Sequence, residues 1–416
     1  MKARKILIIG FLMIASGWVG MLIGEQKIKV AFKNWKPSVI VSKESPLDLG
    51  RGGKEADFAL FWKVWDRVSA LYVDKTALDP KKMIDGAISG MVASLGDPYT
   101  VYLPVTQNQE TKQDLGGYFE GVGIQLGYKD GNLVVVAPLD GTPAHRAGVK
   151  AGDFILRIKD EKKNVDRDTA GITLPEAVNI IRGEKKTAVE LTLLRDGDNK
   201  PFEVSLIRET INVKSVTVEF KEQGDKTIAW IKLTRFGDKT QDEWNAVVSD
   251  IVNHNPEIAG VVLDVRSNPG GYLEGSVYVA SEFLPPGRVV VTQQAGDGSQ
   301  IQEKVSRNGR LINAKLTVIV NEGSASASEI LAGALKDYKR AKVVGVKSFG
   351  KGSVQQPEDF GDGSGIHVTI AKWLTPSGTW IDKNGITPDF IVEMPTDGGD
   401  DTADPQLEKA IDTVLK

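Results

Sequence analysis

The second half of the chain alternates between two hydrophobic patterns, and this alternation narrows the choice of fold more than any other feature. Runs of aliphatic residues predict buried strands at 227–233, 260–266, 316–321 and 342–346. Apolar residues at helical spacing predict helices at 242–252 and 326–337. Strands separated by helices in this way predict a mixed α/β domain in which helices cover a sheet.

One serine and one lysine in this half have neighbours suited to nucleophilic catalysis. Ser326 lies in NEGSASASEI (321–330), at the predicted start of a helix, and Lys351 lies between two glycines in FGKGSVQ (349–355). A serine hydroxyl needs a neighbouring base near neutral pH, and a lysine amine serves as that base only when burial lowers its pKa. The pair therefore predicts a Ser/Lys hydrolase site.

Each residue of this pair also has a structural interpretation. Ser326 and Glu329 fit a capping box, in which two side chains satisfy N–H groups at a helix start. Lys351 is otherwise a solvated lysine, or the end of a segment, 345–351, that reproduces most of a phosphate-binding P-loop. Gly352 follows it where a P-loop has Ser or Thr, which argues against phosphate binding.

The composition gives other chemistries less support. The chain has no cysteine, which excludes a thiol nucleophile, a disulfide framework and thiolate zinc sites. Its three histidines, His145, His254 and His367, are expected to be structural or surface residues, and no His-Glu-x-x-His sequence offers a zinc protease site. The chain has 52 basic and 55 acidic residues, so its charge indicates no nucleic-acid partner.

The N-terminus carries an export pattern. Lys2, Arg4 and Lys5 precede an uncharged apolar run at 6–24. The run matches the roughly 20 residues of a membrane span and exceeds the about 7 to 15 of a signal-peptide core, so we expect an anchor rather than a cleaved signal peptide. The positive charges predict that the remainder faces outward, into the periplasm or the cell exterior. A buried soluble helix is the other alternative.

The composition then changes twice before the α/β region. Residues 25–55 are rich in Lys, Pro, Ser and Gly and predict a linker. Residues 56–110 predict a helical region, because aromatic residues recur at helical spacing from Phe58 to Tyr72 and a second amphipathic pattern covers 83–95. The aromatic side chains suit packing or a homodimer surface better than a cofactor site.

Residues 117–207 have the size and pattern of a PDZ domain, with short strands and one helix near 174–182. Four residues resemble the loop with which such domains hold a terminal carboxylate on successive N–H groups: Gly121, Val122, Gly123 and Ile124. Arg182 follows the helix, and we hypothesise that it links peptide occupancy to the α/β domain. Its alternative is a solvated arginine favoured by the helix dipole.

Three separated segments together resemble the C-terminal processing peptidases, or tail-specific proteases, of family S41: GVVLDVRSNPGGYL at 260–273, the Ser326 segment and the Lys351 segment. The similarity extends from about Phe58 to the terminal helix. It implies a crotonase-like catalytic domain of mixed α/β type. It also implies a serine endopeptidase that recognises protein C-termini through a PDZ domain and cuts with a Ser/Lys dyad through an acyl-enzyme, without metal or cofactor.

The resemblance assigns roles to further residues. Gln355 matches the position that orients the lysine. Backbone N–H groups of Ala327 and of a glycine, Gly271 rather than Gly270, are expected to form the oxyanion hole. Asp337 is sometimes counted in family catalytic sets, but eleven residues of helix place it roughly 16 Å from the nucleophile, so we expect only a supporting role.

These observations predict a multidomain chain whose partner is a protein or peptide with a free C-terminus. The alternative is a catalytically inert PDZ scaffold that binds exported C-termini. The expected boundaries are a signal anchor or signal peptide at 1–24, a linker at 25–55, the N-terminal helical region at 56–110, the PDZ domain at 111–210, the peptidase domain at 211–396, and an acidic linker with a C-terminal helix at 397–416.

Overall fold

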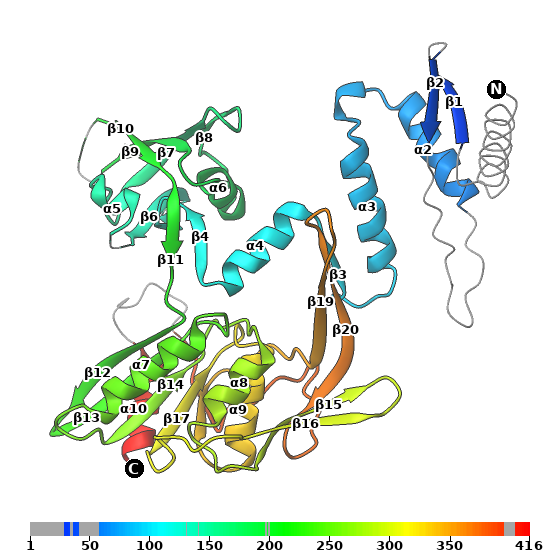
Figure 1. Ribbon diagram of the computed structural model, residues 1–416. Helices are drawn as coiled ribbons and strands as arrows, with labels where there is room; N and C mark the ends of the chain where they lie inside the picture. The colour runs from blue at the N-terminus through cyan, green and yellow to red at the C-terminus, as the bar shows by residue number, and fades with distance from the viewer. Residues whose placement is uncertain are drawn as a thin grey trace, which may run out of the picture. The chain divides into compact units, whose positions relative to one another are not determined.

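A computed structural model of the protein describes residues 29–33, 36–40, 58–129, 131–139, 141–195, 198, 200–394 and 404–416 (Figure 1). The chain divides into two compact units, Met1–Asp79 and Pro80–Lys416. Within the described ranges no helix is long and apolar enough to cross a bilayer. The predicted span at 6–24 lies outside these ranges.

The first unit contains a hairpin and a helix. β1 (Lys29–Lys33) and β2 (Lys36–Ile40) pair antiparallel, so part of the predicted linker at 25–55 has regular backbone pairing. α2 (Ala59–Leu71) and the short 3-10 helix η1 (Lys75–Ala77) follow, and α2 buries none of its residues. This helix confirms the one predicted from the aromatic spacing that begins at Phe58.

The second unit begins with α3 (Pro80–Ala93), β3 (Val101–Leu103) and α4 (Val105–Leu115). β3 pairs antiparallel with β20 (Gly365–Leu374), more than 250 positions later in the chain. The Asn108 amide on α4 donates to Asp359 at 2.8 Å, which joins the same regions. This N-terminal segment is therefore attached to a sheet of the α/β domain.

A small β-rich domain follows, with a core of its own. Its sheet has the order β10-β9-β7-β6-β5, and β8 pairs with β7. Alternate residues of β9 (Val189, Leu191 and Leu193) are buried, which is the period-two pattern of a half-buried strand. Its elements are β4 (Tyr118–Gly121), β5 (Ile124–Lys129), β6 (Asn132–Pro138), α5 (Pro143–Arg146), β7 (Phe154–Asp160), β8 (Val165–Asp168), α6 (Leu174–Ile181), β9 (Ala188–Leu194) and β10 (Phe202–Ile207).

The strands that enter and leave this domain pair with each other. β11 (Glu209–Asn212) runs antiparallel to β4, which precedes the domain's sheet. Arg208, immediately before β11, is buried and donates to Asp160 and to the carbonyl oxygens of Ile180 and Ile181 at the end of α6. The buried guanidinium therefore ties α6 to the exit strand.

A six-stranded sheet forms the centre of the α/β domain, in the order β12-β13-β14-β17-β18-β21. The pairs from β13 to β21 are parallel, and β12 is antiparallel to β13. The mixed α/β prediction is therefore confirmed. The strands are β12 (Val216–Gln223), β13 (Lys226–Leu233), β14 (Gly260–Asp264), β17 (Leu316–Val320), β18 (Lys342–Gly345) and β21 (Phe390–Ile391).

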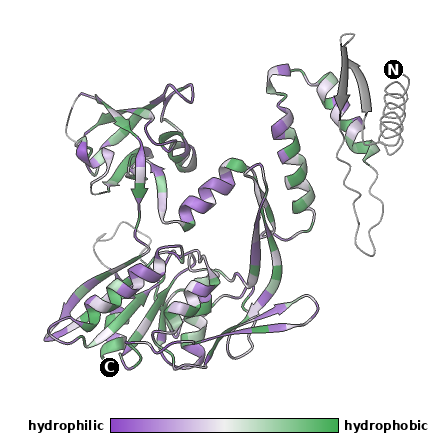
Figure 2. Cartoon of the chain, viewed as in Figure 1, coloured by the Kyte–Doolittle hydropathy of each residue, from purple (hydrophilic) through white to green (hydrophobic). Residues whose placement is uncertain are grey.

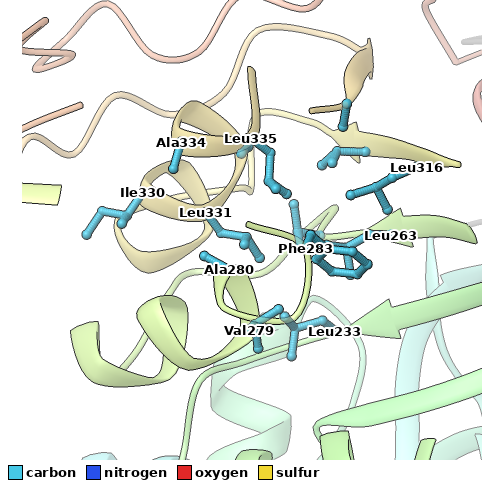
Figure 3. Packing of buried hydrophobic residues seen from close by; sticks show 14 of the residues in the cluster. Leu233, Leu263, Val279, Ala280, Phe283, Leu316, Ile330, Leu331, Ala334 and Leu335 are labelled. Atoms are coloured by element: carbon cyan, nitrogen blue, oxygen red, sulfur yellow. The ribbon is translucent and has the colours of Figure 1, made fainter. Parts of the chain in front are cut away.

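Helices bury both faces of this sheet. On one face, Val261 and Leu263 pack in a core with α7 (Thr240–Val252), α8 (Leu273–Ala280) and α9 (Ala327–Asp337), as Figure 3 shows for α8 and α9. On the other, Val262 packs with α10 (Pro405–Leu415). Figure 2 shows the inner strands of this sheet as mainly hydrophobic, the pattern expected of parallel strands covered on both sides.

A second sheet has the order β16-β15-β20-β19, with β3 beside β20. Its remaining strands are β15 (Val289–Ala295), β16 (Gln300–Lys304) and β19 (Ser353–Asp359). β19 begins two residues after Lys351, so this sheet and the loop after β18 together position the lysine.

Candidate active site

Ser326 occupies a strained backbone position at the start of α9. A short turn joins β17 to this helix, and Ser326 has φ 54° and ψ −114°, in a region that residues with a Cβ rarely adopt. Such strain costs about 1–3 kcal/mol and concentrates at functional sites. The Ser326 N–H donates to Glu329 at 2.8 Å, so the half of the capping box that uses the glutamate is formed.

Lys351 lies in the loop between β18 and β19 and is half-buried. Burial lowers the pKa of its amine, although the charges of Asp97 and Glu329 act in the opposite direction. Its Nζ atom lies 4.9 Å from the centre of the Tyr99 ring, which comes from the loop before β3. A lysine base needs a shift in this direction, because burial penalises the charged form of the amine.

Ser326 and Lys351 line one cavity of about 800 Å³. The cavity is also lined by Gln355 and by the glycine pair Gly270 and Gly271. The structure therefore brings Ser326, Lys351, Gln355 and the two glycines, from three separate segments, to one cavity.

The N–H groups around Ser326 differ in their availability. The Gly270 N–H donates to the Asn268 side chain at 2.9 Å. Among the hydrogen bonds of the described residues, none uses the N–H of Gly271 or of Ala327. A Cβ added to Gly270 would lie 3.1 Å from the Ala327 nitrogen, so the glycine turn and the start of α9 are in close contact. Gly271 is thus the glycine with a free donor.

Two residues of the predicted set bond elsewhere. The Gln355 amide donates to Ser353 at 2.8 Å and to Thr369 at 3.2 Å, and no bond between Gln355 and Lys351 is among those of the described chain. Asp337 ends α9 and accepts the Ser377 N–H at 2.8 Å. Asp337 therefore supports a turn at the far end of the helix that Ser326 begins.

Sequence reasoning did not anticipate three residues near the dyad. Glu329, treated as a helix cap, also accepts the Lys351 N–H at 2.9 Å. Tyr99 faces the lysine amine, and burial raises the pKa of this tyrosine. His367, expected to be structural or at the surface, lines the cavity, and burial together with the charge of Lys351 lowers its pKa. Only the capping-box spacing gave a sequence signal, and it concerned Glu329 alone.

A second cavity, of about 240 Å³, lies in the β-rich domain between the loop before β5 and the helix α6. Val178 and Ile181 of α6 supply its apolar wall, as expected for a groove that takes a peptide side chain. The loop residues that line it are the four predicted ones: Gly121, Val122, Gly123 and Ile124.

Arg182 also lines this second cavity. Its guanidinium carbon lies 4.7 Å from the centre of the Phe119 ring on β4, the strand that enters the domain. Arg182 therefore contacts both the groove and the entry strand, and it is not simply a solvated helix end.

Comparison with protein families accounts for most of the chain. Residues 227–392 match the model of peptidase family S41, residues 121–206 match a PDZ domain, and residues 19–107 match the N-terminal domain of the activating protease CtpB. The predicted fold class, with an N-terminal region, a PDZ domain and an α/β peptidase domain, is confirmed.

Individual proteins agree with these matches. The carboxy-terminal-processing protease of Bartonella bacilliformis is 38% identical over 86% of this chain and 80% of its own length. The carboxy-terminal processing protease CtpA of Bacillus subtilis is 35% identical over 80% of this chain and 68% of its own. The fold also resembles the crystal structure of a protein assigned to the S41 proteases from Bacteroides fragilis, with a TM-score of 0.55, 15% identity, and coverage of 82% and 92% of the two chains.

Proposed function

Because the chain belongs to the carboxy-terminal processing proteases of family S41, which are serine-type peptidases, we propose that Ser326 is its nucleophile and Lys351 its general base. The observation that carries this assignment is the cavity that both residues line, in which burial lowers the pKa of the amine. The histidines offer a weaker alternative, because the one that lines this cavity, His367, also lies under the influence of Lys351.

The reaction proceeds through an acyl-enzyme. Neutral Lys351 takes the proton of the Ser326 hydroxyl as its oxygen attacks the peptide carbonyl, and the resulting ammonium then protonates the leaving amine. A water molecule, deprotonated by the same lysine, releases the acyl group. The N–H groups of Gly271 and Ala327 hold the oxyanion, because both are free of protein acceptors in the described structure.

Gln355 and Asp337 have smaller parts in this mechanism. For Gln355 to orient the lysine, its amide must give up its bonds to Ser353 and Thr369. Asp337 acts through the turn at Ser377 and touches no reacting group.

The PDZ domain supplies the C-terminal specificity. The N–H groups of the loop Gly121–Ile124 bind the substrate's terminal carboxylate, and its last residues pair with β5 while an apolar side chain enters the groove beside α6. The family match and this groove support binding of a protein or peptide with a free C-terminus.

We further propose that the protein works outside the cytoplasm, attached to the membrane by residues 6–24. The charge pattern before this run supports the orientation. A homodimer is proposed through α2, whose exposed apolar side chains include Leu60, Trp62 and Val64.

Two substitutions test the dyad in protein lacking residues 1–24. Ser326→Ala and Lys351→Ala are expected to abolish cleavage of an unfolded protein substrate, followed by mass spectrometry of the products, while thermal unfolding confirms that both variants fold. Equal cleavage by both variants and the parent protein would overturn the dyad. Cleavage by none of the three would favour an inert PDZ scaffold.

A further inference from the structure

One buried carboxylate joins the two loops that carry the proposed dyad. Glu329 has none of its surface exposed. Its Oε2 atom accepts the backbone N–H of Ser326 at 2.8 Å and that of Lys351 at 2.9 Å. Its Oε1 atom accepts the Ser348 hydroxyl at 2.6 Å and the Gly350 N–H at 2.7 Å. All four bonds are charge-assisted, which makes them stronger than bonds between neutral groups.

The shared oxygen fixes the spacing of the two backbones. The backbone nitrogen atoms of Ser326 and Lys351 both donate to Oε2, so this one atom limits how far apart they can lie. The two residues follow different strands, β17 and β18, so the chain itself does not hold them in register. The bond to Glu329 also stabilises the positive φ of Ser326, a conformation that surrounding interactions must maintain.

We propose that Glu329 is a positioning residue of the peptidase, which holds the backbones of Ser326 and Lys351 at the spacing that proton transfer requires. The role goes beyond a helix cap, because three of the four donors belong to the loop that carries Lys351 and not to the first turn of α9. This inference rests on the proposed Ser/Lys dyad. Glu329 acts through the two residues and not on the substrate.

The charge of Glu329 provides a signature that packing alone lacks. Glu329 and Asp97 both raise the pKa of Lys351 against the larger lowering by burial. The other titratable groups that face the amine are Tyr99, from the loop before β3, and His367 on β20. Removal of the Glu329 charge therefore favours the neutral amine and lowers the pKa of Lys351 further.

Glu329→Gln is the test, because it keeps the shape and removes the charge. An amide has one oxygen, so it cannot accept all four bonds, and its NH₂ group faces N–H donors. We expect kcat to fall about 100-fold from the misplaced dyad, with KM little changed. The acidic limb of the pH profile of kcat/KM should move to lower pH. Glu329→Asp keeps the charge but is shorter, so kcat should fall while the limb stays in place.

Glu282→Gln is the matched control. Glu282 is also fully buried and accepts bonds from Trp244, Arg307 and the Arg310 N–H, but none of its bonds comes from the segments that carry the dyad. This variant should lose stability and keep both kcat, measured below its unfolding temperature, and the position of the acidic limb. The comparison separates the loss of a buried carboxylate from the loss of positioning.

The outcomes distinguish this inference from the dyad itself. If Ser326→Ala and Lys351→Ala both remain active, the proposed function fails. If both are inactive but Glu329→Gln keeps kcat within about threefold of the parent and an unmoved acidic limb, only the role of Glu329 is overturned. Should Glu329→Gln not fold, Ser348→Ala removes one of the four bonds, and an unchanged kcat in that variant and in Glu329→Asp would overturn the role.

Discussion

At Lys351 the fold withdraws an amine from water without placing it in an ion pair. None of the ion pairs of the described residues includes it, and the Tyr99 ring lies against its Nζ atom. Burial lowers its pKa, and the charges of Asp97 and Glu329 only partly oppose the effect. A solvated lysine would have neither property, so the residue is prepared to accept a proton.

The pH dependence of activity follows from this environment. Protonated Lys351 cannot act as a base, so kcat/KM should rise with pH until the lowered pKa of the amine is passed, and then level off. The profile of kcat/KM on a peptide without titratable side chains measures this limb. A rate that falls as pH rises through the neutral range would contradict a lysine base.

Replacement of Lys351 should show how much its buried amine lowers the stability of the fold. Lys351→Met removes a buried amine and retains its length, so we expect no activity and a free energy of unfolding higher by about 1 kcal/mol at neutral pH. Since burial lowers the folded-state pKa, the gain should grow as pH falls. Chemical denaturation measures this gain in the free energy of unfolding. Lys347→Met, at an exposed position of the same loop, is the control and should change stability by less than about 0.5 kcal/mol.

At the scale of elements, the hydrophobic runs of the catalytic domain were readable because both faces of the sheet are covered. Consecutive residues of β14, such as Val262 and Leu263, enter different cores. α10 supplies one of these covers, and Arg266 joins Asp404, just before this helix, at 2.8 Å. The pKa of Asp404 is lowered chiefly by its bonds to Arg266 and the helix backbone, which outweigh burial.

The contribution of α10 to the stability of the domain can be measured with one substitution. Ile411 faces the sheet from α10 and is almost fully buried. Ile411→Ala should lower the free energy of unfolding by about 2 kcal/mol, because it leaves a cavity under the helix. Asp412→Ala, on the exposed side, is the control and should have little effect. If thermal unfolding shows equal stability for the two variants, α10 does not cover the sheet as described.

A second prediction at this scale concerns the end of α6. Arg182 lines the peptide groove and contacts Phe119 on the entry strand, so we expect it to relay occupancy of the groove. Arg182→Ala should reduce turnover of substrates with a C-terminal recognition sequence by about tenfold, a coupling of ordinary size. Turnover of substrates without that sequence should change little. Unchanged turnover of both would remove the hypothesis.

At the scale of the whole molecule, one polypeptide carries two separate cavities, and we propose that one binds the substrate's C-terminus and the other the bond to be cut. The 240 Å³ groove belongs to the PDZ domain, and the 800 Å³ cavity belongs to the peptidase domain and the α4 segment that precedes the PDZ domain. β4 and β11 pair where the chain enters and leaves the PDZ domain. Recognition and cleavage can therefore involve different parts of one substrate.

This division predicts a dependence on the substrate's terminal carboxylate. Amidation of the substrate C-terminus removes the charge that we propose the loop N–H groups bind, so kcat/KM should fall by about tenfold or more. Mass spectrometry of products from free and amidated forms of one substrate measures both the rate and the position of the cut. Equal rates would show that the PDZ domain does not select for the carboxylate.

The sequence alone predicted four strands of the central sheet, two of the helices that cover it, and the candidate pair Ser326 and Lys351, because periodicity and residue type are local properties of the chain. It assigned Gln355 a bond that the structure gives to Ser353 and Thr369. Only the tertiary structure placed Tyr99 and His367 near the lysine and Glu329 between the two loops. Those contacts join segments far apart in sequence, and they depend on how sheets and helices pack rather than on any neighbouring residues.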